Sequence, residues 1–587
     1  MSSKRRTHSN FISIQFFLKR RRIIFHFFFI SSVSLLLFQN CSNRTFTDKP
    51  STLSSTVTPL DTSSPIVSTT ETFPDIIVTN VSYDSTTGIF TSVVKNQGTA
   101  ATPADVYVGV SYSVDGTDRT WGSVMGPLAA GASATIGTGE GAYIIPNGTH
   151  TITVFADDAL RVSESNESNN KLSKAIDITS VSPPTLLPVF PGAKGFGTKT
   201  VAGRGGQILK VTNLNDSGAG SLRAAITTTG PRIIIFEVGG HIKLSSDLEI
   251  RQPFVTIAGQ SAPFPGIQIS NGRLTIQTHD VLVQHLRARY GDYSGTNESH
   301  AMRVITGSYN VVVDHCTFMW ADDEVATIWT NNLPIHDVTL SNNIIAEGLG
   351  DHGYGTIVGA PYTPSPGPNW VDKISLVKNL YAHNDERSPS LSRDVNAVVI
   401  NNLSYNAKYQ FIVVGLNDGP TTASIIGNHF ITGASNSGGT AIHVAPGGIG
   451  SHIYQTDNLV TGIFSRTLFS DGTSSSVVAT PPIADDSTIL KASAVKDYVL
   501  GHVGAWPAFR DSAETRVIND VRNGTGTHKN SIAEAGGWPT IYNTPTTRTL
   551  TDLIPANPNG DDDYDGYTNI EEVLEGMAAA VEGRSAL

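Results

Sequence analysis

The residues with the clearest capacity for chemistry lie near the C-terminus, in a twelve-residue segment that begins at Asp561. Acidic residues hold positions 1, 3 and 5 of the segment, Gly566 holds position 6 and a glutamate holds position 12. This spacing is that of an EF-hand loop, in which alternate residues turn their oxygen atoms toward one Ca²⁺ ion and the glycine permits the sharp bend. The predicted calcium ligands are Asp561, Asp563, Asp565, the carbonyl of Tyr567, Asn569 and Glu572. Because the sequence has no second loop of this pattern, we expect a structural ion that secures the C-terminal tail, followed by a helix over 571–580.

A second set of polar residues lies in the middle of the chain and offers carboxylates, imidazoles and a guanidinium. Its members are Glu298, His300, Asp323, Glu324, His352, Tyr354 and Arg387. Carboxylates bind divalent cations, and a histidine can protonate a leaving oxygen. An arginine keeps its proton up to about pH 12, so Arg387 is better suited to bind an anion and stabilise developing charge than to remove a proton. Side chains alternate between the faces of a strand, so Asp323 and Glu324 are not expected to reach one ion from a regular strand.

These groups also have plain structural interpretations. Arg387 can form a surface salt bridge with Asp385 or Glu386. His352 can stabilise its Gly-rich turn, and the acids of 322–324 can face solvent on a bend. The choice depends on which elements carry these residues.

The N-terminal segment has the features of an export signal. Residues 1–22 contain seven Lys and Arg residues and no acid, and residues 23–38 form a 16-residue apolar run. A basic region before a short apolar run is typical of a signal peptide, whereas a membrane-spanning helix needs about 20 apolar residues. The run stops just before Cys41 and resembles a bacterial lipoprotein signal, in which that cysteine is lipidated. We therefore expect residues 1–40 to be a lipoprotein-type signal peptide, and the exported protein to be anchored to a bacterial membrane or secreted. An uncleaved anchor, or an ordinary signal peptide with an incidental cysteine, is the alternative.

The composition excludes several classes of protein. Charged residues make up 16% of the 587 residues and the net charge is −11, so nucleic acid is not expected as a partner. Two cysteines are too few for a disulfide scaffold or a cysteine-based zinc module. A hydrophobic fraction of 39% with 55 glycines favours a β-rich protein of several domains. Residues 41–72 are rich in Ser, Thr and Pro, which predicts a flexible tether.

Residues 73–181 consist of short apolar runs, such as 106–112 and 150–155, separated by turn signals. This pattern is typical of a β-sandwich. Segments 94–99 and 162–170 resemble the CARDB family of bacterial immunoglobulin-like modules. The resemblance implies an N-terminal immunoglobulin-like β-sandwich that serves as a spacer or adhesion unit and carries no chemistry.

From residue 186 the sequence repeats. A polar residue, usually Asn, stands between apolar residues at positions 315, 343, 379, 402, 429 and 458, with spacings of 23 to 36 residues. This period, built from short bursts of Val, Ile and Leu, predicts a right-handed, single-stranded parallel β-helix with Asn side chains stacked at equivalent bends. A β-sandwich with chance Asn pairs is the alternative. Within the repeat, Asp314 and His315 are expected to form an internal hydrogen-bonded pair with an architectural role, and Trp329 is expected in the core.

Five blocks in the same region give a more specific resemblance. They are, in order, 190–197 (FPGAKGFG), 203–206 (GRGG), 211–223 (VTNLNDSGAGSLR), 256–263 (TIAGQSAP) and 313–315 (VDH). Together they make residues 186–550 similar to pectate lyases of polysaccharide lyase family 1. The resemblance implies cleavage of α-1,4-linked galacturonan by β-elimination, in which the C5 proton is removed and the C4 oxygen leaves. The uronate carboxylate must then be held by positive charge, and calcium is the cofactor that the resemblance implies.

The resemblance also assigns roles to the central residues. Its Arg-x-Pro motif makes Arg387 the catalytic arginine, with His352 as a second candidate. Arg393 and Tyr354 are the candidates for substrate binding, although two serines stand where the family often has another arginine. The family's calcium ligands map to Glu298, His300, Asp323 and Thr327, an incomplete carboxylate set that the neighbouring Glu324 could complete.

We therefore predict an all-β, exported lyase that cleaves polygalacturonate with the help of calcium, followed by the calcium loop and helix of residues 551–587. The expected partner is an acidic plant polysaccharide, pectate or pectin, with membrane contact through the lipid anchor alone, and the expected state is a monomer. One alternative is a lyase for methylated pectin or another uronan. Another is an inactive β-helix that binds glycans or mediates adhesion.

Overall fold

The structure is a computed structural model, and two compact units that divide near residue 175 are described separately. The residues described are 72–84, 88–138, 142–143, 145, 148–178, 187–291, 298–361, 370–416, 419–474, 476–551 and 553–586. The predicted signal peptide, Cys41 and nearly all of the predicted tether lie outside these residues. Within them, every helix is too short or too polar to cross a membrane.

The N-terminal unit consists of two sheets. One contains β1 (Ile76–Asp84), β2 (Ile89–Asn96) and β5 (Ser133–Gly137), and the other contains β4 (Thr117–Met125), β3 (Tyr107–Val114), β6 (Gly148–Ala156) and β7 (Lys171–Ile178). Buried and partly exposed residues alternate along β2, as expected of a strand with one face in a core. The sheets are joined through Tyr112 of β3, whose hydroxyl donates to the Ile136 carbonyl (2.8 Å) and contacts the Ser92 hydroxyl (2.8 Å). The predicted β-sandwich is confirmed.

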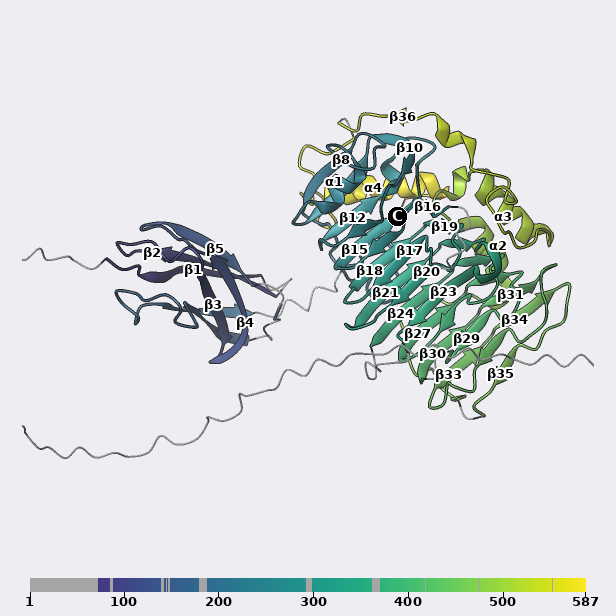
Figure 1. The fold of residues 1–587 in the computed structure, drawn as a ribbon, viewed down its shortest axis with the longest axis horizontal. Coiled ribbons are helices and arrows are strands. Elements are labelled where there is room, and N and C mark those ends of the chain that lie inside the picture. Colours follow the sequence, from purple (N-terminus) through teal and green to yellow (C-terminus); the bar gives the residue numbers. More distant parts are fainter. Residues whose placement is uncertain are drawn as a thin grey trace, which may run out of the picture. The chain divides into compact units, whose positions relative to one another are not determined.

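The C-terminal unit is a parallel β-helix of three sheets (Figure 1). Sheet I contains β8 (Gln207–Val211), β9 (Arg232–Phe236), β12 (Val255–Ala258), β15 (His279–Gln284), β18 (Tyr309–Asp314), β21 (Ile335–Ser341), β24 (Val371–Val377), β27 (Val395–Ile400), β30 (Thr421–Ile426) and β33 (His452–Thr456). Sheet II contains β10 (Val238–Lys243), β13 (Ile267–Ser270), β16 (Leu286–Arg289), β19 (Thr317–Met319), β22 (Ile344–Ala346), β25 (Leu380–Ala382), β28 (Leu403–Tyr405), β31 (His429–Thr432) and β34 (Leu459–Gly462), with β36 (Thr546–Thr547) antiparallel to β10.

Sheet III contains β11 (Leu248–Ile250), β14 (Leu274–Ile276), β17 (Met302–Ile305), β20 (Glu324–Trp329), β23 (Tyr354–Gly359), β26 (Ser390–Leu391), β29 (Ile412–Val414), β32 (Ile442–Val444) and β35 (Phe469–Asp471). Neighbouring strands in each sheet differ by three in chain order, so each coil adds one strand to every sheet. The predicted right-handed parallel β-helix is confirmed.

The core of the β-helix is a stack of aliphatic columns. One column in sheet I consists of Ile234, Ile257, Val283, Val313, Leu340, Leu376, Val399 and Ile425, all buried and in register from coil to coil. A short helix, α1 (Leu222–Thr227), adds its buried residues Leu222 and Ile226 to this core. The repeated Val, Ile and Leu bursts of the sequence are therefore the inward faces of the strands.

An asparagine ladder follows the bend between sheets I and II. The backbone N–H of Asn343 donates to Oδ1 of Asn379 (3.0 Å), and the same bond links Asn379 to Asn402 (2.9 Å) and Asn402 to Asn428 (2.9 Å). The predicted stacking of Asn side chains is present, but two of the aligned positions were wrong by one residue. Cys316 and Asn428 occupy the ladder, whereas His315 lies one residue before it and His429 begins β31.

Asn402→Ala is expected to lower the free energy of unfolding of the β-helix by about 2–4 kcal/mol. The substitution leaves the buried N–H of Asn379 and the carbonyl of Leu376 without their partner, and each unsatisfied group costs about 1–3 kcal/mol. Chemical denaturation measures the change. Asn530→Ala, at an exposed position, is the control and should change the unfolding free energy by about 0.5 kcal/mol or less. Equal effects of the two substitutions would contradict the prediction.

Helices cover parts of the β-helix that the sequence analysis left as coils up to residue 550. The coils end at β35, and α2 (Ala492–His502) and α3 (Ser512–Asn523) pack on sheet II (Figure 1). Val499 and Val517 of these helices join Ile344 and Leu380 in one buried cluster. The last helix, α4 (Asn569–Glu582), packs Ile570 and Leu574 on sheet I, where it contacts Ile233 and Ile235. Short 3₁₀ turns occur at Gly259–Ser261, Gly350–His352, Pro507–Phe509 and Thr540–Asn543.

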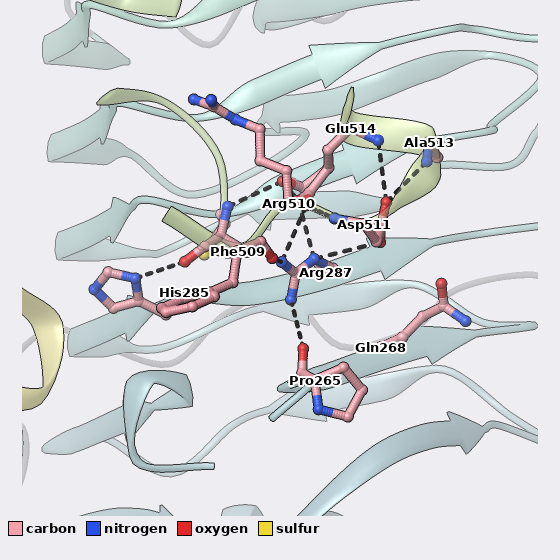
Figure 2. A network of polar contacts seen from close by, with 12 residues as sticks. Pro265, Gln268, His285, Arg287, Phe509, Arg510, Asp511, Ala513 and Glu514 are labelled. Carbon is pink, nitrogen blue, oxygen red and sulfur yellow. Dashed lines mark hydrogen bonds and ion pairs between the residues drawn. The ribbon is translucent and has the colours of Figure 1, made fainter. Parts of the chain in front are cut away.

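Buried charges fasten α3 to sheet II (Figure 2). Arg287 of β16 donates to both carboxylate oxygens of Glu514, each at 3.0 Å, and both side chains are fully buried. Arg289 donates to Asp511 (2.7 Å), which also caps the start of α3 through the N–H groups of Ala513 and Glu514. Arginines on the outer face of a strand are thus neutralised by the helix that covers them.

Candidate active site

The central polar residues meet on the outer face of sheet III. A cavity of about 530 Å³ lies over β17 and β20 and is lined by Gln277, His300, Arg303, Asp323, Glu324, Thr327 and Trp329, among others. Outward residues of adjacent coils pair in register, as Arg303 does with Thr327. The parallel strands therefore bring side chains that are about 25 residues apart in sequence to one surface.

His300, Asp323 and Glu324 form the acidic centre of this cavity. One ligand atom from each lies within 4.8 Å of the others. His300 Nε2 is 3.6 Å from Asp323 Oδ2, and its Nδ1 is 3.8 Å from Glu324 Oε2. Asp323 and Glu324 lie together despite strand alternation because β20 begins at Glu324, so Asp323 belongs to the preceding bend.

The electrostatics of this centre fit a cation. Burial, and then the neighbouring charge of Glu324, raise the pKa of Asp323 to about 8. A cation between the two carboxylates would offset both the cost of burying the Asp323 charge and its repulsion from Glu324. His300 is neutral at pH 7, because burial lowers its pKa to about 4. The donor set of two carboxylates and one imidazole is smaller than Ca²⁺ prefers, so substrate or water oxygens would have to complete it.

Arg387 joins this centre from the bend before β26. Its Nη1 donates to Glu324 Oε1, and its guanidinium lies 4.0 Å from the centre of the Tyr354 ring. The side chain is 15% exposed, and its Nε is buried without a hydrogen-bond partner among the described residues. The surface salt bridge with Asp385 is not formed, since Asp385 instead pairs with His528 (2.6 Å) and Lys408 (3.5 Å).

His352 and Tyr354 complete the group. His352 Nε2 is 3.2 Å from Asp323 Oδ1, and its ring packs edge-on against Tyr354 with 4.3 Å between centroids. Burial, followed by the positive charge of Arg387, lowers the pKa of His352. Burial raises the pKa of Tyr354, so its hydroxyl keeps its proton. An imidazole, a phenol and a guanidinium are thus held beside the two carboxylates.

Two of the predicted residues are not brought to this centre. The Glu298 side chain is exposed and is not a member of the His300 group, and its backbone carbonyl accepts from Arg273 (2.8 Å). Arg393 lies beyond the far end of β26, and its Nε donates to its neighbour Asp394 (3.1 Å).

The sequence analysis did not select Arg303, and it placed Trp329 in the core. Both line the cavity, and Trp329 is partly exposed. A signal was available for Arg303, because it is a charged residue between the apolar residues Met302 and Val304, both buried. Alternation along a strand then requires Arg303 to face outward.

The C-terminal loop brings three of its predicted ligands together. One carboxylate oxygen each from Asp561, Asp563 and Asp565 lies within 4.8 Å of the others. Asp561 Oδ2 accepts from the N–H of Gly566 (3.0 Å), whose φ of 97° is readily adopted by glycine. Asp561 Oδ1 is buried with no hydrogen-bond partner among the described residues, as expected of an oxygen that awaits a cation.

The two other predicted side-chain ligands of the loop, Glu572 and Asn569, differ in what they contact. Burial and the charges of Asp563 and Asp565 raise the pKa of Glu572, so this side chain also faces the acidic group. Asn569 is turned to the backbone, where it donates to the Asn557 carbonyl (2.8 Å) and accepts from the N–H of Asp562 (3.1 Å).

Comparisons with known proteins agree with this architecture. Residues 73–174 match the CARDB family. "Probable pectate lyase C" of Neosartorya fischeri is 35% identical over 416 residues, which cover 66% of this chain and 93% of that protein. The protein of the same name from Aspergillus fumigatus is 34% identical over 417 residues, with the same coverage of 66% and 93%. The crystal structure of Jun a 1, the major cedar-pollen allergen, is 18% identical and covers 52% of this chain and 91% of that one, with a TM-score of 0.42.

Proposed function

This chain belongs to the pectate lyase family and carries a CARDB domain at residues 73–174, and on this premise we propose that it cleaves polygalacturonate by β-elimination on sheet III. The observation that carries the proposal is the position of Arg387. Its guanidinium has an unused buried N–H and donates to Glu324, which together with Asp323 lines a cavity of about 530 Å³. An elongated anionic polymer can occupy such a groove, which Arg303 and Trp329 also line.

Arg387 binds and stabilises the uronate at the reacting centre. Its Nη1 donates to Glu324, so in this structure the guanidinium acts as a hydrogen-bond donor and not as a base. A planar guanidinium can donate two parallel hydrogen bonds to a carboxylate. The charge that develops on the uronate as C5 loses its proton would therefore be stabilised by Arg387.

Asp323, Glu324 and His300 would hold the cation, with the remaining ligands supplied by the uronate. Bound there, calcium would supply positive charge that acidifies the C5 proton. His352, which is neutral at pH 7 and 35% exposed, is the group best placed to exchange a proton with the sugar. Trp329 offers an apolar face for a sugar ring.

One assay tests the function. The mature protein is incubated with polygalacturonate and with methylated pectin, each with calcium or with a chelator, and the unsaturated product is followed by its ultraviolet absorbance. Calcium-dependent product from polygalacturonate is the expected result. Product from methylated pectin alone, unaffected by chelator, would favour the pectin lyase alternative that the small carboxylate set allows. Absence of product under all conditions would leave a glycan-binding β-helix.

We also propose that the C-terminal loop binds a structural calcium ion. Asp561→Ala is expected to abolish the rise in melting temperature that calcium gives the wild-type protein, because a ligand that binds the folded state stabilises it by mass action. Differential scanning calorimetry with calcium and with chelator measures the effect. Asp562→Ala is the matched control, since position 2 of the loop is not a ligand position. A calcium response that survives Asp561→Ala would place the stabilising ion elsewhere.

Export and lipid anchoring through Cys41 remain our proposal from the sequence. Cys41→Ser should abolish incorporation of labelled palmitate in a bacterial host, and incorporation that persists in the variant would contradict lipidation at this residue.

A further inference from the structure

Two histidines and a glutamate that the lyase chemistry does not use meet at the bend between sheets I and II. His285 lies between β15 and β16, and His315 lies between β18 and β19 on the next coil. Both have left-handed backbone conformations, with φ of 58° and 47°. Their rings stack at 5.4 Å with an interplanar angle of 16°, so they point in the same direction.

Glu582, the last residue of α4, faces both rings. Its Oε1 is 3.4 Å from His285 Nε2, and its Oε2 is 3.7 Å from His315 Nε2. One ligand atom from each of the three residues lies within 4.8 Å of the others. A tetrahedral ion with bonds of about 2.0–2.2 Å needs ligand atoms roughly 3.3–3.6 Å apart, so small side-chain shifts would suffice.

Hydrogen bonds to the Nδ1 atoms of the two histidines, and to the carboxylate of Glu582, fix the orientation of all three side chains. His285 Nδ1 is 2.7 Å from the Ala505 carbonyl, a bond drawn in Figure 2, and His315 Nδ1 is 2.6 Å from Asp314 Oδ2. Both partners are acceptors, so each Nδ1 donates and each Nε2 faces Glu582. Arg584 Nε donates to Glu582 Oε2 (2.6 Å) and orients the carboxylate. Metal-ligating histidines are usually held by such second bonds.

The burial of the group argues for an occupant. His285 is fully buried, and its Nε2 has no hydrogen-bond partner among the described residues. The His315 and Glu582 side chains are 10% and 8% exposed. A buried nitrogen without a hydrogen bond is costly, and a metal bond would satisfy it better than the Glu582 oxygen at 3.4 Å does. The metal-free competitor is a protonated His315 between Asp314 and Glu582.

We propose that His285, His315 and Glu582 bind a divalent transition-metal ion of the zinc type, which fastens α4 to two coils of the β-helix. Two imidazoles and a carboxylate are a common zinc set and are poor ligands for calcium. The near-complete burial indicates a structural ion. This site is independent of the proposed lyase activity.

Metal analysis of the full mature chain tests the site. The protein is stripped with chelator, loaded with Zn²⁺, freed of excess metal and analysed by mass spectrometry of the elements. His285→Asn is the principal variant, because Asn342 occupies the equivalent bend one coil after His315 with φ of 54°. We expect the wild type to retain an equimolar amount of zinc that His285→Asn loses. Loading with Co²⁺ should give the visible absorption of a low-coordinate cobalt site in the wild type but not in His285→Asn.

Three further variants assign the ion to this group. His300→Ala should keep the zinc, which separates the site from the lyase groove, and the exposed His452→Asn is the matched control. Glu582→Gln changes the end of α4 and tests the site if His285→Asn folds poorly. Zinc content that is equal in the wild type, His285→Asn and Glu582→Gln would overturn the proposal. Absence of zinc and cobalt from the wild type would also overturn it and favour the protonated His315.

Discussion

Arg387→Ala is expected to lower kcat/KM on polygalacturonate by about 10²–10³-fold, because one donor aimed at developing charge contributes about that factor. The guanidinium is held in place by the Tyr354 ring at 4.0 Å and by Glu324. Its buried Nε and its exposed edge are free to bind a uronate carboxylate. Alanine removes these donors and also leaves the Glu324 carboxylate without the guanidinium with which it pairs. The loss should appear mainly in kcat, since the interaction is strongest as charge develops.

Two variants make this result interpretable. Arg387→Lys keeps the charge but not the planar pair of donors, so it should recover part of the rate. Arg119→Ala is the matched control, because Arg119 also lies over a tyrosine ring, that of Tyr143 at 4.6 Å, but in the N-terminal unit. It should leave kcat/KM unchanged. Full activity of Arg387→Ala, with an unchanged melting temperature, would show that Arg387 does not act on the substrate.

Glu514→Ala is expected to lower the free energy of unfolding of the β-helix domain by about 3–5 kcal/mol. Removal of one partner of a fully buried ion pair leaves the other charge uncompensated in a medium of low dielectric constant. Glu514 accepts two bonds from Arg287 and one from Thr317 (2.5 Å), and Asp511 is 3.5 Å from Arg287 and replaces it poorly. The substitution also removes the Glu514 half of the capping box at the start of α3.

Urea denaturation of the full chain, followed by tryptophan fluorescence, measures this change. Glu534→Ala removes an exposed glutamate from the same C-terminal segment and should cost about 0.5 kcal/mol or less. Glu514→Gln should fall between the two, because it keeps hydrogen bonds and loses charge. A loss below about 1 kcal/mol for Glu514→Ala would mean that α3 is held by its apolar face and not by the ion pair.

The repeats and motifs of the sequence predicted much of this protein. Short bursts of Val, Ile and Leu at coil spacing indicate a solenoid, because the inward-facing side chains of one coil must stack on the inward-facing side chains of the next coil. The Asn ladder was predicted from the same repeat, because equivalent bends stack from coil to coil. Only its register was wrong by one residue, at Cys316 and Asn428. The acidic loop at Asp561 is local, so its spacing predicts its geometry.

The helices α2 and α3 were not predicted, because their partners lie far away in sequence. Arg287 in β16 gives no sign that Glu514, 227 residues later, will neutralise it. The apolar outer face of sheet II likewise requires a cover without specifying which segment supplies it.

By itself the sequence determined the coil repeat, the parallel β-helix, the β-sandwich before it, the acidic loop and the family. These depend on local spacing, alternation and ordered motifs. Only the tertiary structure decided which side chains share a site. It brought His300, Asp323, Glu324, His352 and Arg387 together, left Glu298 and Arg393 apart, and joined His285 and His315 to Glu582. The physical reason is that coil-to-coil register and the docking of the C-terminal helices are set by contacts distant in sequence, which spacing along one chain does not encode.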